Sequence, residues 1–99
     1  MGRGIQTIIA GEVFATKKDL TVRVRAIVSK YRFGDFLDAA DTDFCMALFK
    51  FHTESQRKIG SGVSKIEIRR DEYGKKYMHI HRTDGTDTDI SWTHCVASI

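Results

Sequence analysis

Apolar residues recur at helical spacing in the segment that follows Thr16. The members of this stripe are Leu20, Val24, Ile27, Val28 and Tyr31. Their period predicts an amphipathic helix over residues 17–31. Thr16 is the expected N-cap, with Asp19 three residues later completing a capping box. Gly34 is the expected left-handed residue in the segment that breaks the helix.

A second apolar face follows a run of acidic residues. Its members are Phe44, Cys45, Leu48, Phe49 and Phe51. It predicts a helix over residues 41–52, capped by Asp41 or Thr42. Residues 53–57 are polar and are expected to form a loop or a short extra turn. Ahead of both helices, residues 5–9 are expected to form a short strand, to which Val13-Phe14 returns.

Alternating apolar and polar residues predict strands in the second half of the chain. The first strand covers residues 63–70, with Ile66 and Ile68 on one face. The second covers residues 76–82 and puts its aromatic and histidine side chains on the opposite face from its apolar ones. A loop with Gly74 at a position of positive φ is expected to join the two strands as a hairpin.

A second hairpin is expected to close the sheet. The Asp84-Gly85 pair is a strong tight-turn signal, and it predicts a third strand over residues 86–92. Asp89 is then expected to pair with Arg82 across the hairpin. Trp92, at the end of this strand, is either a stacking group or a core side chain. Residues 93–99 are expected to add a short helical turn or an extra edge.

Helices early and strands late predict an α+β fold. We expect two helices packed on one face of a small, mainly antiparallel sheet with a C-terminal three-stranded meander. The 99 residues, 41% hydrophobic and 29% charged, are typical of a single globular domain over residues 1–99. The expected core residues are Leu20, Val24, Ile27, Phe44, Leu48, Ile66, Ile68 and Ile80.

Charge is distributed unevenly along the chain. The formal net charge is +3, but residues 57–82 hold eight Lys or Arg against three acids, and residues 83–99 hold three acids and no Lys or Arg. A basic segment of this kind favours a polyanion such as RNA, and an ordinary solvated hairpin gives the same pattern. The candidate nucleic-acid contacts are Lys58, Gly60, Gly62, Arg69, Arg70, Lys75, Lys76, Tyr77, His79, His81 and Arg82. Arg23, Arg25 and Lys30 on the first helix are the alternative contact side.

Two interpretations are open for the segment Lys58-Ile59-Gly60-Ser61-Gly62. Its backbone N–H groups could hold a phosphate, with Lys58 as the counter-charge. Alternatively, the two glycines permit a sharp entry into the strand that follows. The segment is not a P-loop, because no Gly-Lys-Ser/Thr follows and the strand comes after the glycines.

Metal binding and hydrolysis are further possibilities for the polar strand residues. His79 and His81 share a strand face and could hold zinc, but the chain has no CxxC or HxxxH spacing, so we expect no metal. Asp87 and Asp89 share a face as well, and with Glu67 they could hold magnesium for a nuclease. Carboxylates beside an Asp-Gly turn more commonly accept backbone N–H groups.

The cysteines give no sign of catalysis. His94 and Cys95 are adjacent, and neighbours on a strand point to opposite faces. No export signal is apparent, so the expected location is the cytoplasm, where Cys45 and Cys95 would be reduced. A disulfide between them stays open, because the sequence sets no limit on the distance between the two residues. The chain is therefore expected not to be an enzyme and to need no cofactor.

Several of these residues together resemble the DCL ("defective chloroplasts and leaves") family. They are Phe14-Ala15-Thr16-Lys17-Lys18, Asp43-Phe44, Lys58-Ile59-Gly60-Ser61-Gly62, Arg82 with Asp84-Gly85, and Asp89-Ile90-Ser91-Trp92 followed by Cys95. The resemblance implies a single DCL-like domain of the uncharacterised bacterial type. Plant members are plastid proteins linked to ribosomal RNA maturation, and a similar domain ends the largest subunits of plant-specific RNA polymerases. No transit peptide is apparent, so the plastid location is not carried over.

A small binding module is the function expected from the sequence. RNA or a ribonucleoprotein is the expected partner, with phosphates on the basic residues and bases near Tyr77, His79 and His81. A protein-interaction domain is the alternative, and a small metal-dependent nuclease is the third possibility. No membrane partner is expected, because no apolar run is long enough to span a bilayer.

Overall fold

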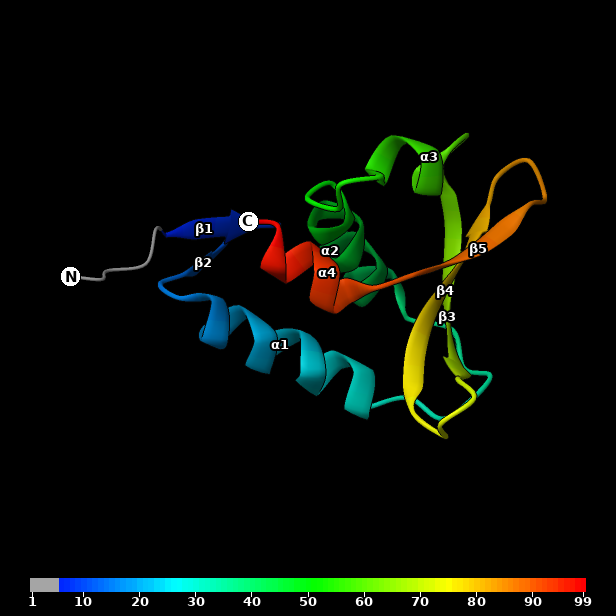
Figure 1. The fold of residues 1–99 in the computed structure, drawn as a ribbon, viewed down its shortest axis with the longest axis horizontal. Helices are drawn as coiled ribbons and strands as arrows, with labels where there is room; N and C mark the ends of the chain where they lie inside the picture. Colours follow the sequence, from blue (N-terminus) through cyan, green and yellow to red (C-terminus); the bar gives the residue numbers. More distant parts are fainter. Residues whose placement is uncertain (1–5) are drawn as a thin grey trace.

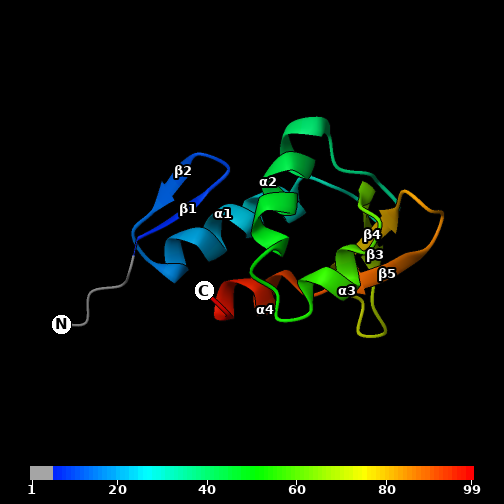
Figure 2. The same ribbon diagram turned by 90° about the horizontal axis from the view of Figure 1, so that it is seen from above.

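The computed structural model describes residues 6–99 and has helices and antiparallel strands in separate layers. In chain order the elements are β1 (Thr7–Ile9), β2 (Glu12–Phe14), α1 (Lys17–Ser29), α2 (Ala39–Phe49), α3 (Ser55–Ile59), β3 (Val63–Arg70), β4 (Lys76–Arg82), β5 (Asp87–Ile90) and α4 (Trp92–Ala97). Figures 1 and 2 show the helices between the β1–β2 hairpin at one end and the three-stranded sheet at the other. The α+β prediction is confirmed. None of the described helices is long and apolar enough to cross a membrane.

Helix α1 forms as its sequence predicts. The Asp19 N–H donates to Thr16 Oγ1 over 3.1 Å, which caps the first turn. The stripe of Leu20, Val24, Ile27 and Val28 is buried, and the helix ends two residues earlier than predicted. Gly34 has φ 92°, the left-handed conformation expected after the helix. Of the short N-terminal strand, Ile5 lies outside the described residues, and β1 pairs with β2 as expected.

Helix α2 begins earlier than the sequence suggested. Its N-cap is Asp38, whose Oδ1 accepts the Asp41 N–H over 2.8 Å, so capping by Asp41 or Thr42 was wrong. Asp41 lies inside the first turn and is buried, where its carboxylate accepts Tyr31 Oη and meets Lys30 Nζ, each at 2.6 Å. Burial raises the pKa of Asp41, but the hydrogen bonds from Lys30 and Tyr31 outweigh it and hold the pKa below its ordinary value.

The three-stranded sheet has the order β3-β4-β5, with the first two strands at the predicted bounds. The third strand was predicted too long. It ends at Ile90, and Trp92 is the first residue of α4, because Ser91 Oγ accepts the His94 N–H over 3.2 Å and starts a helix. The tail over residues 93–99 is therefore largely helical, one of the two predicted possibilities.

A short extended segment runs along the free edge of β3. The Gly34 N–H donates to the Ile68 carbonyl over 2.7 Å, and the Leu37 N–H donates to the Ile66 carbonyl over 2.9 Å. Phe36 forms an isolated antiparallel bridge with Glu67. This pairing brings a side chain from the α1–α2 connection to the edge of the sheet.

The core lies between the helices and one face of the sheet. All eight predicted core residues are buried, and Met78 and Ile90 join them from β4 and β5. The opposite face, which we call the outer face, carries the alternate residues of each strand and is polar. Figure 1 shows this sheet at one end of the molecule with the helices on one side of it.

Candidate functional site

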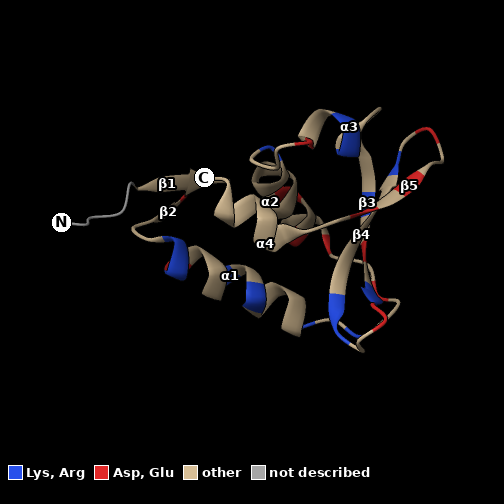
Figure 3. Cartoon of the chain, viewed as in Figure 1, with Lys and Arg blue, Asp and Glu red and all other residues tan. Residues whose placement is uncertain are grey.

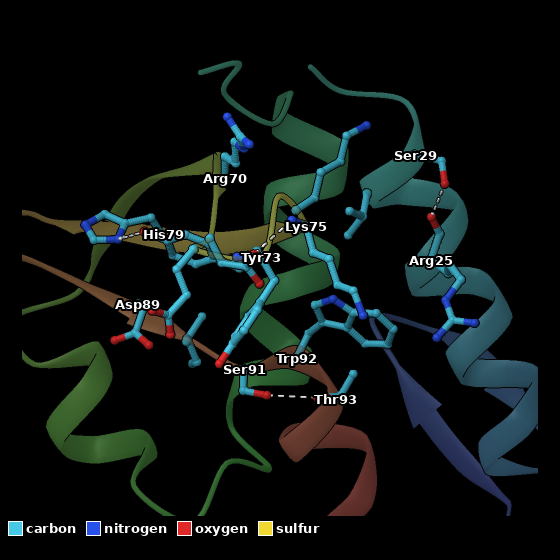
Figure 4. A pocket seen from close by; sticks show the side chains of 16 residues that line it. Arg25, Ser29, Arg70, Tyr73, Lys75, His79, Asp89, Ser91, Trp92 and Thr93 are labelled. Carbon is cyan, nitrogen blue, oxygen red and sulfur yellow. Dashed lines mark hydrogen bonds between the residues drawn. The ribbon is translucent and has the colours of Figure 1, made fainter. Parts of the chain in front are cut away.

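A groove of about 1000 Å³ lies where the end of the β3–β4 hairpin meets α1 and the β5–α4 junction. It forms because β5 ends at Ile90, which leaves the β4 edge unpaired at Lys76 and Tyr77. Figure 4 shows Arg25 and Ser29 of α1 on one side, Arg70 and His79 on the other, and Trp92 between them. The groove thus joins segments that lie far apart in the sequence.

Four cationic side chains line this groove. Arg70, Lys75 and Lys76 come from the basic hairpin, and Arg25 comes from α1. Lys76 Nζ donates to the Tyr31 carbonyl, so its position is fixed, whereas Arg25, Arg70 and Lys75 are exposed. Figure 3 shows Lys and Arg segments on α1 and at this end of β3 and β4, with acidic segments at the β4–β5 turn. Of the alternative contact side on α1, Arg25 lines the groove with the hairpin cations, whereas Arg23 pairs with Glu12 and Lys30 pairs with Asp41.

Aromatic rings accompany these cations. Tyr73 in the hairpin loop is 79% exposed, and Tyr77 is partly exposed on β4. Trp92 is only 9% exposed, so most of the indole packs in the core. The Arg25 guanidinium lies 5.9 Å from the Trp92 ring centroid, close enough for a cation–π contact. Of the two roles considered for Trp92, core packing is the one observed.

Three acidic side chains also line the groove and temper its charge. Asp71 Oδ1 accepts the N–H groups of Tyr73 and Lys75, each over 2.8 Å, and so holds the hairpin loop. Asp89 lies 3.5 Å from Lys58 Nζ. Glu72 is exposed in the turn. Two of the three carboxylates are thus already engaged by donors of the protein.

The two strand histidines lie on the outer face, each beside a carboxylate. His79 Nε2 is 2.5 Å from Asp87 Oδ2, and His81 Nε2 is 2.8 Å from Glu67 Oε1. The contact with His79 holds the pKa of Asp87 below its ordinary value. Burial raises the pKa of Glu67, but hydrogen bonds from His81 and Arg69 hold it below its ordinary value. Both acids are therefore carboxylates at neutral pH.

The Lys58–Gly62 segment is tied to Arg82 rather than open to a ligand. The Arg82 Nε–H donates to the Lys58 carbonyl over 2.9 Å, and Lys58 Nζ donates to the Asp89 carbonyl over 3.0 Å. Gly60 has φ 55°, and a Cβ there would lie 2.9 Å from Arg82 Cδ. This geometry favours the interpretation of the glycines as conformational devices over the phosphate loop.

Arg82 and Asp89 do not pair, contrary to the prediction. In the β4–β5 register Asp89 lies opposite His79, whereas Arg82 lies beyond the last pair and donates to Thr86 Oγ1 over 3.0 Å. The turn itself is as predicted. Gly85 has φ 89°, and Asp84 Oδ1 accepts the Thr86 N–H over 3.0 Å.

The remaining catalytic candidates are the two cysteines and the carboxylates of the sheet. Cys45 and Cys95 are free and buried, and burial raises the pKa of each thiol to about 12. Glu67 and Asp87 lie on strands separated by β4, and each contacts its own histidine. Across residues 6–99, no three His, Cys, Asp or Glu side chains gather in a way that could hold a metal ion.

The groove gathers about half of the candidate contacts. It includes Arg70, Lys75, Lys76, Tyr77 and His79. Arg69 and His81 lie on the outer face beside it, while Lys58, Gly60, Gly62 and Arg82 lie together near α3. Sequence reasoning did not assign Tyr73 or Phe36, because loop positions carry no periodicity from which to infer a shared surface.

Residues 25–96 match the model of a family described as "Protein of unknown function (DUF3223)". The fold is similar to the solution NMR structure of an uncharacterized protein from Rhodospirillum rubrum. The two are 34% identical with a TM-score of 0.85, and the match covers 96% of this chain and 89% of that one.

A plant polymerase subunit contains a similar segment. The chain is 28% identical over 98 residues to DNA-directed RNA polymerase IV subunit 1 of Arabidopsis thaliana. The match covers 96% of this chain but only 7% of the subunit. The similarity therefore concerns one small segment of a much larger protein.

Proposed function

The chain belongs to the DUF3223 family, and we propose that it binds single-stranded RNA in the groove between the β3–β4 hairpin and α1. The observation that carries this proposal is the convergence of cations from two distant segments on two tyrosines, one exposed and one partly exposed. Arg25 from α1 and the hairpin cations Arg70 and Lys75 line the same groove as Tyr73 and Tyr77.

This combination suits a single strand for two separate physical reasons. The cations neutralise phosphates and release counterions, which gives affinity without sequence preference. The tyrosines offer flat faces on which unpaired bases can stack, at about 1–3 kcal/mol per base. An A-form duplex keeps its bases stacked inside, where a tyrosine ring in a groove cannot reach their faces.

Two similarities support RNA as the ligand. The DCL resemblance implies a role near RNA, and it remains a prediction from the sequence. The plant relative is, by its name, a subunit of an RNA polymerase. A small module of this kind would hold RNA close to another protein or complex and would not itself catalyse a reaction.

Fluorescence anisotropy with a labelled, unstructured RNA of about 12 nucleotides tests the proposal, since related sites cover roughly 4–16 nucleotides. We expect weak binding that falls steeply with salt. The variant Arg25→Ala/Arg70→Ala/Lys75→Ala should flatten the slope of log affinity against log salt by about 0.7 for each phosphate that the protein no longer neutralises. Lys76 is spared because it holds the Tyr31 carbonyl.

A charge-matched control separates the groove from general basicity. Lys18→Ala/Lys50→Ala/Arg57→Ala removes the same charge from exposed positions outside the groove, and it should leave the slope close to that of the parent. Equal effects of the two triple variants would refute the groove as the site. No binding of any RNA at low salt would refute the proposed function itself.

A protein partner is the second candidate, because one surface feature favours it. Ile8 and Val13 pair across the β1–β2 hairpin and are 65% and 59% exposed. Exposed apolar side chains at an extended end of a small domain suit a protein contact. If RNA binding is absent, Ile8→Ser and Val13→Ser are the variants to test. Each should fail to bind a protein partner that the parent binds.

A further inference from the structure

We infer that the outer face of the sheet is a second contact surface, which takes an unpaired base of the same RNA strand on Phe36. This inference rests on the proposed function of the groove, but it concerns different residues. Phe36 comes from the α1–α2 connection and reaches the outer face through its bridge to Glu67. It is 45% exposed, unlike the buried aromatic residues of the core.

Four rings form a continuous row across the outer face, which we call the ring row. It runs from Phe36 to His81, His79 and Tyr77, with successive centroids 5.8, 5.5 and 5.9 Å apart and each contact edge-on. The rings at the ends of the row are more exposed than His79 in its middle. His79 is only 8% exposed, so the rings open to a ligand are those at or near the ends.

The ring row leads directly into the groove. Tyr77 and His79 belong to both, since both line the groove, Tyr77 from the unpaired end of β4 and His79 from the position opposite Asp89. A strand whose phosphates lie on the groove cations can therefore continue over Tyr77 toward Phe36 without leaving the protein surface. Aromatic side chains on an exposed antiparallel sheet are a common platform for the bases of single-stranded RNA.

The histidines of the row are held in place by acids. Asp87 fixes His79, and Glu67 fixes His81 from the neighbouring strand. His81 in turn lies edge-on against Phe36. Because these contacts fix the neighbouring imidazole, the Phe36 ring stands against a rigid support, which lowers the entropic cost when a base stacks on it.

A cation already covers the Phe36 ring. Lys65 Nζ lies 4.4 Å from the ring centroid, on an exposed side chain of β3. An exposed cation–π contact contributes about 2- to 5-fold to an equilibrium, whereas one stacked base contributes about 5- to 150-fold. A base can therefore displace the ammonium group, which then lies where it can pair with an adjacent phosphate.

The alanine variant of Phe36 gives the direct test, with the same RNA of about 12 nucleotides. Phe36→Ala should weaken binding by about 5- to 150-fold and leave the salt slope unchanged, because stacking releases no counterions. Phe36→Trp, which keeps an aromatic ring at this position, should bind the RNA about as tightly as the parent. The matched control is Phe33→Ala in the same connection, since Phe33 is 51% exposed and has no ring contact with the row.

The outcomes separate this inference from the proposed function. If Phe36→Ala binds like the Phe33→Ala control while the Arg25/Arg70/Lys75 variant shows a flattened salt dependence, the outer face is wrong and the groove stands. If Phe36→Ala binds more weakly while the triple variant does not, the groove is wrong and the outer face stands. Retention of affinity by both variants refutes both surfaces.

A second readout guards against an indirect effect of the substitution. In the parent protein, the aromatic NMR signals of Phe36 and His81 should shift upfield as the RNA is added, because a stacked base imposes its ring current on them. These shifts should persist in the groove variant at higher RNA concentration. Unmoved Phe36 signals at saturation of the groove would overturn the inference.

Discussion

Gly60→Ala tests whether the glycine pair serves the fold or a phosphate. Gly60 follows α3 and has φ 55° and ψ −122°, and the Gly62 N–H donates to the Ile59 carbonyl over 3.0 Å. These values match the first central position of a type II′ turn, which favours glycine. An alanine Cβ at this position would also lie 2.9 Å from Arg82 Cδ and 3.0 Å from Nε.

Two separable costs follow from this geometry. The backbone conformation should cost a non-glycine residue about 1–3 kcal/mol. Displacing Arg82 should cost a further 1–3 kcal/mol or so, because its guanidinium donates to the carbonyls of Lys58 and Arg57 and each bond contributes about 0.5–1.5 kcal/mol. We therefore expect Gly60→Ala to lower the free energy of unfolding by about 2–6 kcal/mol, a large share of the ~5–15 kcal/mol typical of a domain.

A double-mutant cycle measured by urea unfolding separates the two costs. In an Arg82→Ala background the steric conflict is absent, so Gly60→Ala should cost only the backbone strain, and the coupling energy should be about 1–3 kcal/mol. Additive effects would show that Arg82 is not the reason for glycine. A Gly60→Ala protein of unchanged stability that no longer binds RNA would instead support the phosphate loop.

Further predictions concern the core, the buried acid, the thiols and metal. Leu48→Ala should cost about 2–5 kcal/mol in urea unfolding, since Leu48 is fully buried, and a value near zero would contradict the packing of α2. Asp41→Asn should cost about 1–3 kcal/mol at neutral pH. Because the folded pKa of Asp41 is lowered, this contribution is complete above a pH of about 4 and is lost as the pH falls through the folded value, so the parent and variant curves should converge in acid. Cys45 and Cys95, with pKa values raised to about 12, should react with a thiol reagent only after unfolding, and rapid labelling of the native protein would contradict their burial. Elemental analysis should find no stoichiometric zinc.

The secondary structure was largely predictable from the sequence because it depends on local rules. The stripe from Leu20 to Val28 and the alternation around Ile66 place their helix and strand with little help from the rest of the chain. The errors fell at element ends. Asp38, rather than Asp41, caps α2, and Asp41 is instead buried in an ion pair with Lys30. No local pattern reports that burial, because it depends on tertiary contacts.

The candidate site depended more heavily on tertiary structure. The sequence identified the basic hairpin residues Lys75 and Lys76, since charge can be counted along a chain. It could not decide that Arg25 lines the same groove, because that depends on how α1 packs beside the hairpin.

Pairing and packing also assigned the roles that the sequence left open. Asp89 does not meet Arg82, because the β4–β5 register places it opposite His79. Phe36 reaches the outer face only through backbone hydrogen bonds to β3, in a segment too short to show alternation. Periodicity along the chain determined which faces are apolar, whereas contacts between residues distant in sequence determined which polar side chains share a surface. That second choice depends on the register and packing of the folded chain.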